Sequence, residues 1–174
     1  MGNTPEGLRG PVAIVGYMGS GKTTVGRMLA RALGWDFVDL DREISRRSGL
    51  AIPEIFETSG EDHFRDLEHR ALLATLDGER ERVVACGGGI VERSENRERL
   101  AEVATVFLRE DTGVLFGRTR GARRPLRGAD RKEFERRYER RLPLYREVAD
   151  FEVTVGGRSA QAVAEEIERW ISGA

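Results

Sequence analysis

The sequence predicts an α/β fold of three layers, in which a five-stranded parallel sheet carries helices on both faces. The chain has 174 residues, a length typical of one domain. Short apolar segments alternate along it with segments of helical periodicity, and this alternation favours parallel strands joined by crossover helices. No internal repeat or linker interrupts the pattern. We therefore expect a single domain over residues 1–174.

The expected elements follow from periodicity and from the glycines and prolines that bound them. Residues 1–10 are polar, contain Gly and Pro, and are expected to be a loose tail. Strands are expected at 12–15, 37–41, 83–85, 105–108 and 151–155. Helices are expected at 25–33, 93–101, 112–118, 131–148 and 159–171. Residues 42–76 are expected to be helical, with interruptions at 49–53 and 59–60.

Composition and charge argue against several classes of partner. The chain has 29 basic and 30 acidic residues, so its overall charge does not attract nucleic acid. The longest apolar stretches are far shorter than the roughly 20 residues that span a bilayer, and the N-terminus has no secretory pattern. A single cysteine, Cys86, is compatible with a reducing compartment. We expect a cytoplasmic monomer with no membrane or specific nucleic-acid partner.

A phosphate-binding motif lies between the first predicted strand and helix. Residues 16–23 fit the pattern of Gly, four residues, Gly, Lys and then Ser or Thr. The glycines let backbone N–H groups surround a phosphate, and the helix N-terminus adds a positive dipole. Lys22 can bridge the outer phosphates, and the Thr23 hydroxyl can ligate Mg²⁺. The residues expected to bind a nucleoside triphosphate here are Gly19, Ser20, Gly21, Lys22, Thr23 and Thr24. The alternative is a glycine-rich turn that only caps a helix.

The loop alone does not identify the phosphate acceptor, since GTPases, motor ATPases and small-molecule kinases share it. A GTPase is disfavoured, because neither Lys22 nor Lys132, the two lysines of the chain, lies in a guanine-reading Asn-Lys-x-Asp segment. Two carboxylates end the second predicted strand. Asp39 and Asp41 are two residues apart, so on an extended chain they are expected to point the same way. The alternative for either is the N-cap of the following helix.

Three further motifs carry a resemblance to a known family. They are Gly60-Glu61-Asp62-His63-Phe64-Arg65-Asp66-Leu67-Glu68, Cys86-Gly87-Gly88-Gly89 and Arg124-Pro125-Leu126. With the phosphate loop and the Asp-x-Asp pair, they make residues 11–170 resemble the shikimate kinases. The resemblance implies a P-loop kinase fold with a mobile lid. It also implies transfer of the γ-phosphoryl of ATP to the 3-hydroxyl of shikimate, giving shikimate 3-phosphate and ADP on the route to chorismate and the aromatic amino acids.

The resemblance also implies the acceptor site, within a region at 41–70 and two later segments. A shikimate acceptor has a carboxylate and three hydroxyls, so its site needs fixed cations and hydrogen-bond acceptors. Arg65 and Arg141 match the arginines that hold the carboxylate, and Asp41 matches the aspartate that positions the hydroxyls. Asp39 matches the residue that reaches Mg²⁺ through water. Gly87, Gly88 and Gly89 match the segment that lines the acceptor pocket.

Several neighbours of these residues have two interpretations. Glu68 lies three residues after Arg65 and is expected to fix its guanidinium, the alternative being a surface ion pair. Phe56 and Phe64 match aromatic residues beside the acceptor ring, but aromatic residues at helical spacing are often core. Cys86 is expected to be structural, because a thiol in a buried strand usually acts as a small hydrophobe.

The segment 118–131 is expected to be a lid over the nucleotide. It carries six arginines in fourteen residues, and the alternatives are a solvated basic loop or a nucleic-acid patch. Arg124 matches the family's lid arginine, with the adjacent Arg123 as a rival. Arg118 and Arg158 match residues on the adenine side of ATP.

Two rival functions stay open at this point. One is another P-loop small-molecule kinase or a nucleoside monophosphate kinase, and the other is a nonenzymatic nucleotide- or RNA-binding module. His63 and His69 are six residues apart, which places them on different faces of a helix, so they do not form a metal pair. The only metal expected is Mg²⁺, which accompanies ATP.

Overall fold

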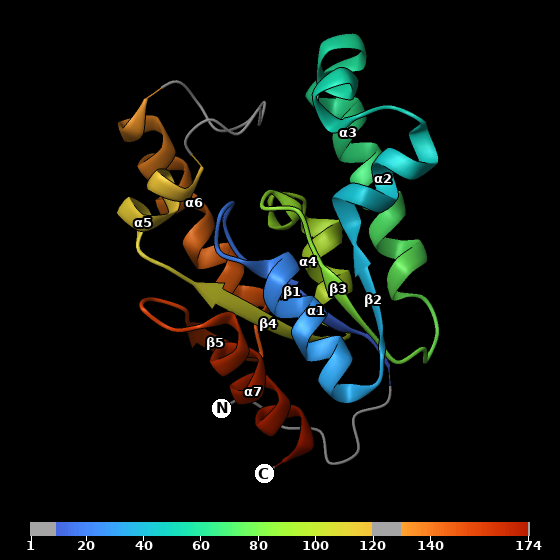
Figure 1. Ribbon diagram of the computed structural model, residues 1–174. Helices are drawn as coiled ribbons and strands as arrows, with labels where there is room; N and C mark the ends of the chain where they lie inside the picture. The colour runs from blue at the N-terminus through green and yellow to red at the C-terminus, as the bar shows by residue number, and fades with distance from the viewer. Residues whose placement is uncertain (1–9, 120–129, 174) are drawn as a thin grey trace.

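The computed structural model describes residues 10–119 and 130–173. Its centre is a five-stranded sheet in the order β2-β3-β1-β4-β5, with every neighbouring pair parallel (Figure 1). The strands are β1 Val12–Val15, β2 Asp36–Asp39, β3 Arg82–Ala85, β4 Ala104–Arg109 and β5 Phe151–Thr154. The predicted α/β class and the five parallel strands are confirmed.

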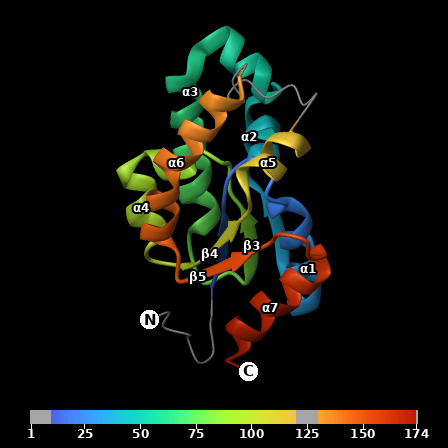
Figure 2. The same ribbon diagram turned by 90° about the vertical axis from the view of Figure 1, so that its left-hand side faces the viewer.

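Helices cover both faces of this sheet and complete the three layers. They are α1 Lys22–Leu33, α2 Leu40–Ser48, α3 Ile52–Leu76, α4 Ser94–Leu100, α5 Thr112–Arg118, α6 Arg131–Val148 and α7 Ala160–Ser172, with a 3₁₀ turn η1 at Ile90–Glu92. Helices α1 and α7 pack together on one face, and α3, α4 and α6 lie on the other (Figure 2). Among the described residues, no helix is both long and apolar enough to cross a bilayer.

The central strand β1 shows why the sheet is buried on both sides. Val12 and Ile14 pack into the core beneath α1 and α7, whereas Ala13 and Val15 pack into the core beneath α3, α4 and α6. All four side chains are fully buried. Alternate residues of a strand face opposite sides, so a strand in the middle of a three-layer fold must be apolar throughout. This explains the continuous apolar run in the sequence.

The second strand is shorter than the sequence predicts. β2 ends at Asp39, and helix α2 begins at Leu40, so the prediction of an extended segment through Asp41 is wrong. The reason is a helix cap: Oδ1 of Asp39 accepts a hydrogen bond from the backbone N–H of Arg42 at 3.3 Å. Asp41 therefore lies in the first turn of a helix and not on a strand.

The interruptions predicted within residues 42–76 are confirmed. Gly49 ends α2 in the left-handed conformation, and Pro53 stands in the first turn of α3. Helix α3 is kinked at Gly60, whose φ of 81° and ψ of 175° are not helical. The expected tail at 1–10 and the expected lid at 118–131 lie largely outside the described residues and stay predictions.

Candidate functional site

The carboxyl ends of the parallel strands lie at one edge of the sheet, where open α/β sheets bind ligands. A cavity of about 240 Å³ lies at this edge. It is lined by Gly19, Gly21, Lys22, Thr23, Thr24, Asp39, Asp41, Ala85, Cys86, Gly87 and Gly88. The cavity thus brings together the phosphate loop, both predicted aspartates and two of the three predicted glycines. Asp41 reaches it from the first turn of α2.

The phosphate loop connects β1 to α1. Gly19 and Gly21 have φ values of 84° and 90°, which other residues rarely adopt. Helix α1 has no acidic residue in its first turn and no side-chain cap at Gly21, so its first N–H groups are available to an anion. Nζ of Lys22 donates to the carbonyl oxygens of Gly16 and Tyr17 at 2.8 and 2.9 Å. The lysine amine is therefore held against the loop that would surround a phosphate.

Two oxygen-bearing side chains stand together beside this loop. Oγ1 of Thr23 donates a hydrogen bond to Oδ2 of Asp39 at 2.7 Å. Hydroxyl and carboxylate oxygens suit Mg²⁺, which usually keeps several waters and takes its other ligands from substrate phosphates. No cluster of three or more His, Cys, Asp or Glu side chains suited to a metal occurs in the described part of the chain. The pair fits Mg²⁺ that arrives with a nucleotide, and it does not fit a metal held by protein alone.

On the other side of the glycines, helix α3 presents a buried ion pair. Nη1 of Arg65 donates to Oε2 of Glu68 at 2.6 Å, and the two side chains are 7% and 1% exposed. This is the expected contact, and its burial excludes the alternative of a surface ion pair. Burial raises the pKa of the Glu68 carboxyl, although the Arg65 guanidinium acts in the opposite direction. Among the described residues, Oε1 of Glu68 and Nε of Arg65 have no hydrogen-bond partner.

The three glycines that follow β3 separate this ion pair from the phosphate loop. A Cβ on Gly87 would lie 2.6 Å from Oε1 of Glu68 and 3.1 Å from Oδ1 of Asp41. A Cβ on Gly89 would overlap the guanidinium of Arg65. These are close approaches that side chains larger than hydrogen cannot make without displacing a charged group. The glycine run is therefore required by its neighbours, which belong to the predicted acceptor site.

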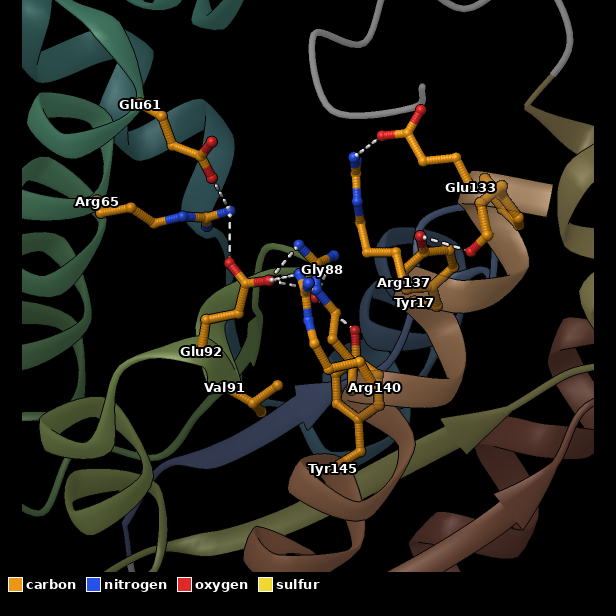
Figure 3. A network of polar contacts seen from close by, with 12 residues as sticks. Tyr17, Glu61, Arg65, Gly88, Val91, Glu92, Glu133, Arg137, Arg140 and Tyr145 are labelled. Atoms are coloured by element: carbon orange, nitrogen blue, oxygen red, sulfur yellow. Dashed lines mark hydrogen bonds and ion pairs between the residues drawn. The ribbon is translucent and has the colours of Figure 1, made fainter. Parts of the chain in front are cut away.

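The second arginine predicted to hold the acceptor carboxylate, Arg141, reaches the same place from helix α6. Its side chain is 2% exposed, and Nη1 donates to the carbonyl oxygen of Gly88 at 3.3 Å. Its guanidinium lies over the ring of Tyr17, 5.4 Å from the ring centre. Oε1 of Glu92 lies 2.9 Å from Nε and 2.8 Å from Nη2 of Arg141. Glu92 also pairs with Arg65 (Figure 3). The two predicted arginines therefore converge on one carboxylate.

Two arginines predicted on the adenine side have different surroundings. Arg118 donates from Nη1 to the carbonyl oxygen of Gly19 at 3.3 Å, and Nη2 pairs with Glu110 at 3.2 Å. It therefore stands at the phosphate loop. Arg158 pairs with Glu166 at 2.5 Å and donates to the backbone at the start of α7. These contacts place Arg158 between β5 and α7.

The structure distinguishes the two interpretations of Phe56, Phe64 and Cys86. Phe64 is 4% exposed and belongs to the core, and Phe56 packs against it with ring centres 4.8 Å apart. Cys86 is buried at the cavity wall, and its burial raises the pKa of the thiol. This favours the structural interpretation. The predicted lid arginine Arg124 and its rival Arg123 lie outside the described residues.

Sequence reasoning missed three contributors to this site. Glu92 bridges Arg65 and Arg141, Tyr145 donates its hydroxyl to the carbonyl oxygen of Gly88, and Tyr17 lies beneath Arg141. Tyr17 belongs to the phosphate loop and Glu92 follows the glycines by three residues, so both lie next to recognised motifs. Nothing in their spacing signals a contact with an arginine on α6, because that contact depends on how distant elements pack.

Together, the parallel sheet, the phosphate loop at the end of its central strand and the adjoining buried cations define a P-loop phosphotransferase of the small-molecule kinase type. A comparison with protein families matches residues 18–172 to shikimate kinase. The chain belongs to the shikimate kinase family.

Individual relatives agree with this assignment. The chain is 39% identical over 160 residues to a shikimate kinase of Thermodesulfovibrio yellowstonii, covering 90% of this chain and 91% of the relative. It is 47% identical over 154 residues to one of Cupriavidus pinatubonensis, covering 86% and 80%. A solved shikimate kinase of Acinetobacter baumannii, in complex with shikimate, superposes with a TM-score of 0.91 at 37% identity, covering 97% and 95%. A gluconokinase of Sinorhizobium meliloti, at 21% identity and TM-score 0.56, shares the fold alone.

Proposed function

We propose that this protein transfers the γ-phosphoryl of ATP to the 3-hydroxyl of shikimate, forming shikimate 3-phosphate and ADP. The observation that carries the proposal is the convergence of Arg65 and Arg141 beside the glycine run, next to the phosphate loop. Two buried guanidinium groups from different helices suit a carboxylate, which they can hold with charge-assisted hydrogen bonds. Nucleoside monophosphate kinases have no need for a carboxylate clamp of this kind.

The donor end of the site would hold ATP through Gly19, Ser20, Gly21, Lys22, Thr23 and Thr24, with Arg118 and Arg158 on the adenine side. Lys22 would leave the loop carbonyls and contact the outer phosphates, where its charge stabilises the transferring group. Mg²⁺, held by Thr23 and through water by Asp39, would neutralise phosphate charge. Arg124, or Arg123 in its place, would add a further cation when the lid closes.

The acceptor end would orient shikimate for attack. Arg65 and Arg141 bind its carboxylate, Gly87, Gly88 and Gly89 allow its ring to approach the backbone, and Asp41 accepts hydrogen bonds from its hydroxyls. Phosphoryl transfer passes through a loose transition state that depends more on positioning than on a strong base. We therefore assign Asp41 first the role of positioning the hydroxyls and second that of accepting the proton of the attacking hydroxyl.

The test is ADP release in a coupled assay with ATP and Mg²⁺, with and without shikimate. We expect turnover that depends on shikimate and is absent with gluconate or nucleoside monophosphates at equal concentration. Turnover with a nucleoside monophosphate but not with shikimate would contradict the proposal. Salt-sensitive RNA binding without any ATP turnover would instead favour a nonenzymatic module.

A further inference from the structure

The arginines assigned to the acceptor carboxylate already hold a carboxylate that belongs to the chain. Oε2 of Glu92 lies 3.3 Å from Nη2 of Arg65, and Oε1 lies 2.8 Å from Nη2 of Arg141. Figure 3 shows Glu92 between the arginine of α3 on one side and the arginines of α6 on the other. Arg65 and Arg141 thus form a clamp with two arms, and each oxygen of Glu92 contacts one arm. A carboxylate of a ligand would be shared between the two arginines in the same way.

Most of the remaining donors of the two arginines are also in use, and Nε of Arg65, which has no hydrogen-bond partner among the described residues, is buried. In Arg141, Nε and Nη2 face Glu92, and Nη1 donates to Gly88. In Arg65, Nη1 donates to Glu68, and Nη2 serves both Glu61 and Glu92. An incoming carboxylate therefore finds the clamp closed, and one of the resident carboxylates must withdraw before it can bind both arginines.

Burial distinguishes which carboxylate can withdraw. The Glu68 side chain is 1% exposed, so a Glu68 carboxylate that left Arg65 would be a buried charge with neither a partner nor water. Among the described residues, Glu61 pairs with Arg65 and not with Arg141, so its movement would free only one of the two arginines. The Glu92 side chain is 24% exposed and contacts both arms. Glu92 is the carboxylate whose movement opens the whole clamp to a ligand.

The surroundings of Glu92 allow its side chain to move while its backbone stays. Nη1 of Arg97 donates to the carbonyl oxygens of Val91 and Glu92 at 2.9 and 3.3 Å, which fixes the 3₁₀ turn. Arg140, whose side chain is 70% exposed, lies 3.4 Å from Oε1 of Glu92 on the solvent side. A Glu92 carboxylate that rotates outward can thus keep a cationic partner in Arg140.

The geometry points to Glu92 as a built-in competitor that occupies the Arg65–Arg141 clamp and is displaced by the carboxylate of the acceptor. This inference rests on the proposed function, since it takes the clamp to be the acceptor's carboxylate site. Glu92 then has two opposite effects. Its charge compensates two buried cations in the free protein, and the same charge weakens the binding of any carboxylate ligand. The apparent affinity of a ligand falls in proportion to the fraction of molecules whose site is open.

The decisive variant is Glu92→Gln, which keeps the shape of the side chain and removes its charge. The matched control is Glu98→Gln, which removes the same charge from an exposed position on α4. We expect Glu92→Gln to lower the KM for shikimate about tenfold, because a neutral amide holds a guanidinium less strongly than a carboxylate does. We expect kcat and the KM for ATP to stay within about twofold of the control. A residue that only maintained the fold would not lower the KM for shikimate while leaving kcat and the KM for ATP nearly unchanged.

A second measurement isolates the carboxylate from catalysis. Cyclohexanecarboxylate carries a ring and a carboxylate without the hydroxyls, and its binding can be followed by the rise in thermal unfolding temperature. Half-maximal stabilisation should need about tenfold less of this probe with Glu92→Gln than with the wild type or the control. This measurement does not depend on turnover. It therefore tests the competitor even if the wild type fails to phosphorylate shikimate, a result that would refute the proposed function alone.

Two results would overturn the inference. An unchanged KM for shikimate together with unchanged probe binding would mean that Glu92 does not compete for the clamp. A raised KM, with weaker binding of the probe, would mean that Glu92 organises the arginines for the ligand and is not its rival. Comparison with the Glu98→Gln control separates either result from the general effect of one lost negative charge.

Discussion

The donor and acceptor ends of the site are built in different ways. The phosphate loop is one uninterrupted segment, and the proposed donor end consists of its backbone groups, one lysine and the N-terminus of α1. The acceptor end is assembled from Arg65 on α3, Arg141 on α6 and the glycines after β3, which are far apart in the sequence. Its two arginines are buried, whereas Lys22 at the donor end is partly exposed.

This difference predicts how each end tolerates change. The phosphate loop is shaped by its backbone and should keep its conformation when one partly exposed side chain is replaced. Changes at the donor end should therefore lower kcat and leave the fold stable. Buried ion pairs are costly to break, because the remaining partner stays without compensation. Changes at the acceptor end should therefore reduce stability and acceptor binding together.

Replacing Lys22 by Met should reduce kcat by about 10² to 10³, the usual cost of removing one group that stabilises transition-state charge. The thermal unfolding temperature should change little, since the Lys22 side chain is partly exposed and water can replace it at the carbonyl oxygens of Gly16 and Tyr17. Steady-state kinetics and a melting curve check both. The control is Lys132→Met, which alters the other lysine of the chain at an exposed position. A folded Lys22→Met enzyme with near-normal kcat would contradict the donor assignment.

Replacing Arg65 by Ala should raise the KM for shikimate about tenfold to hundredfold, because charge-assisted hydrogen bonds contribute about 1.5 to 3 kcal/mol. It should also destabilise the fold by about 3 to 5 kcal/mol, since Glu68 would be left buried without its partner. Kinetics with each substrate varied, and denaturant unfolding, measure these effects. The control is Arg70→Ala, an exposed arginine on the same helix. Equal weakening of ATP and shikimate binding would show that Arg65 is not specific to the acceptor end.

Replacing Gly87 by Ala should destabilise the protein by about 1 to 3 kcal/mol, the usual cost of overfilling a packed site. Its Cβ would lie 2.6 Å from Oε1 of Glu68, and that carboxylate is held by Arg65. The control is Gly117→Ala on α5, where, among the described residues and apart from its own helix backbone, no atom lies within 4 Å of the new Cβ. That change should stabilise by about 0.5 to 1 kcal/mol, because Ala is the better helix former. Loss of stability in both variants would remove the steric explanation.

The same contrast explains which features the sequence could predict. The phosphate loop is local, and its pattern of Gly, Lys and Thr is sufficient to place it. The alternation of strands and helices was also sufficient for the fold class, because each periodicity reflects burial of one element. The predicted end of the second strand at Asp41 is wrong, because Asp39 caps α2 and the helix already begins at Leu40.

The acceptor end could be named only through a family resemblance. Spacing along one helix gave the Arg65–Glu68 pair, which is three residues apart. It could not give Glu92, because the bridge to Arg141 joins residues 49 positions apart in the sequence. Such a contact depends on the packing of α6 against η1, for which no local pattern exists. Long-range ion pairs are thus the part of this site that needed a structure.

The smallest expected effect is on the pH dependence of stability. Burial acts to raise the pKa of Glu92, but Arg141 and Arg65 outweigh it and hold that pKa below its ordinary value of 4.5. A carboxyl whose pKa is lowered on folding stabilises the fold above its ordinary pKa, and this contribution is lost as the pH falls through the folded value. At pH 7, Glu92→Gln should therefore unfold about 2 to 4 °C below the wild type, as expected for a loss of about 1 kcal/mol. Below pH 4.5 the two melting curves should converge, because protonation removes the same charge from the wild type. Melting temperatures from pH 3 to pH 7 measure this, with Glu98→Gln as the control for the loss of one exposed negative charge. A constant gap between Glu92→Gln and the wild type at every pH would mean that the shape of the side chain, and not its charge, stabilises the clamp.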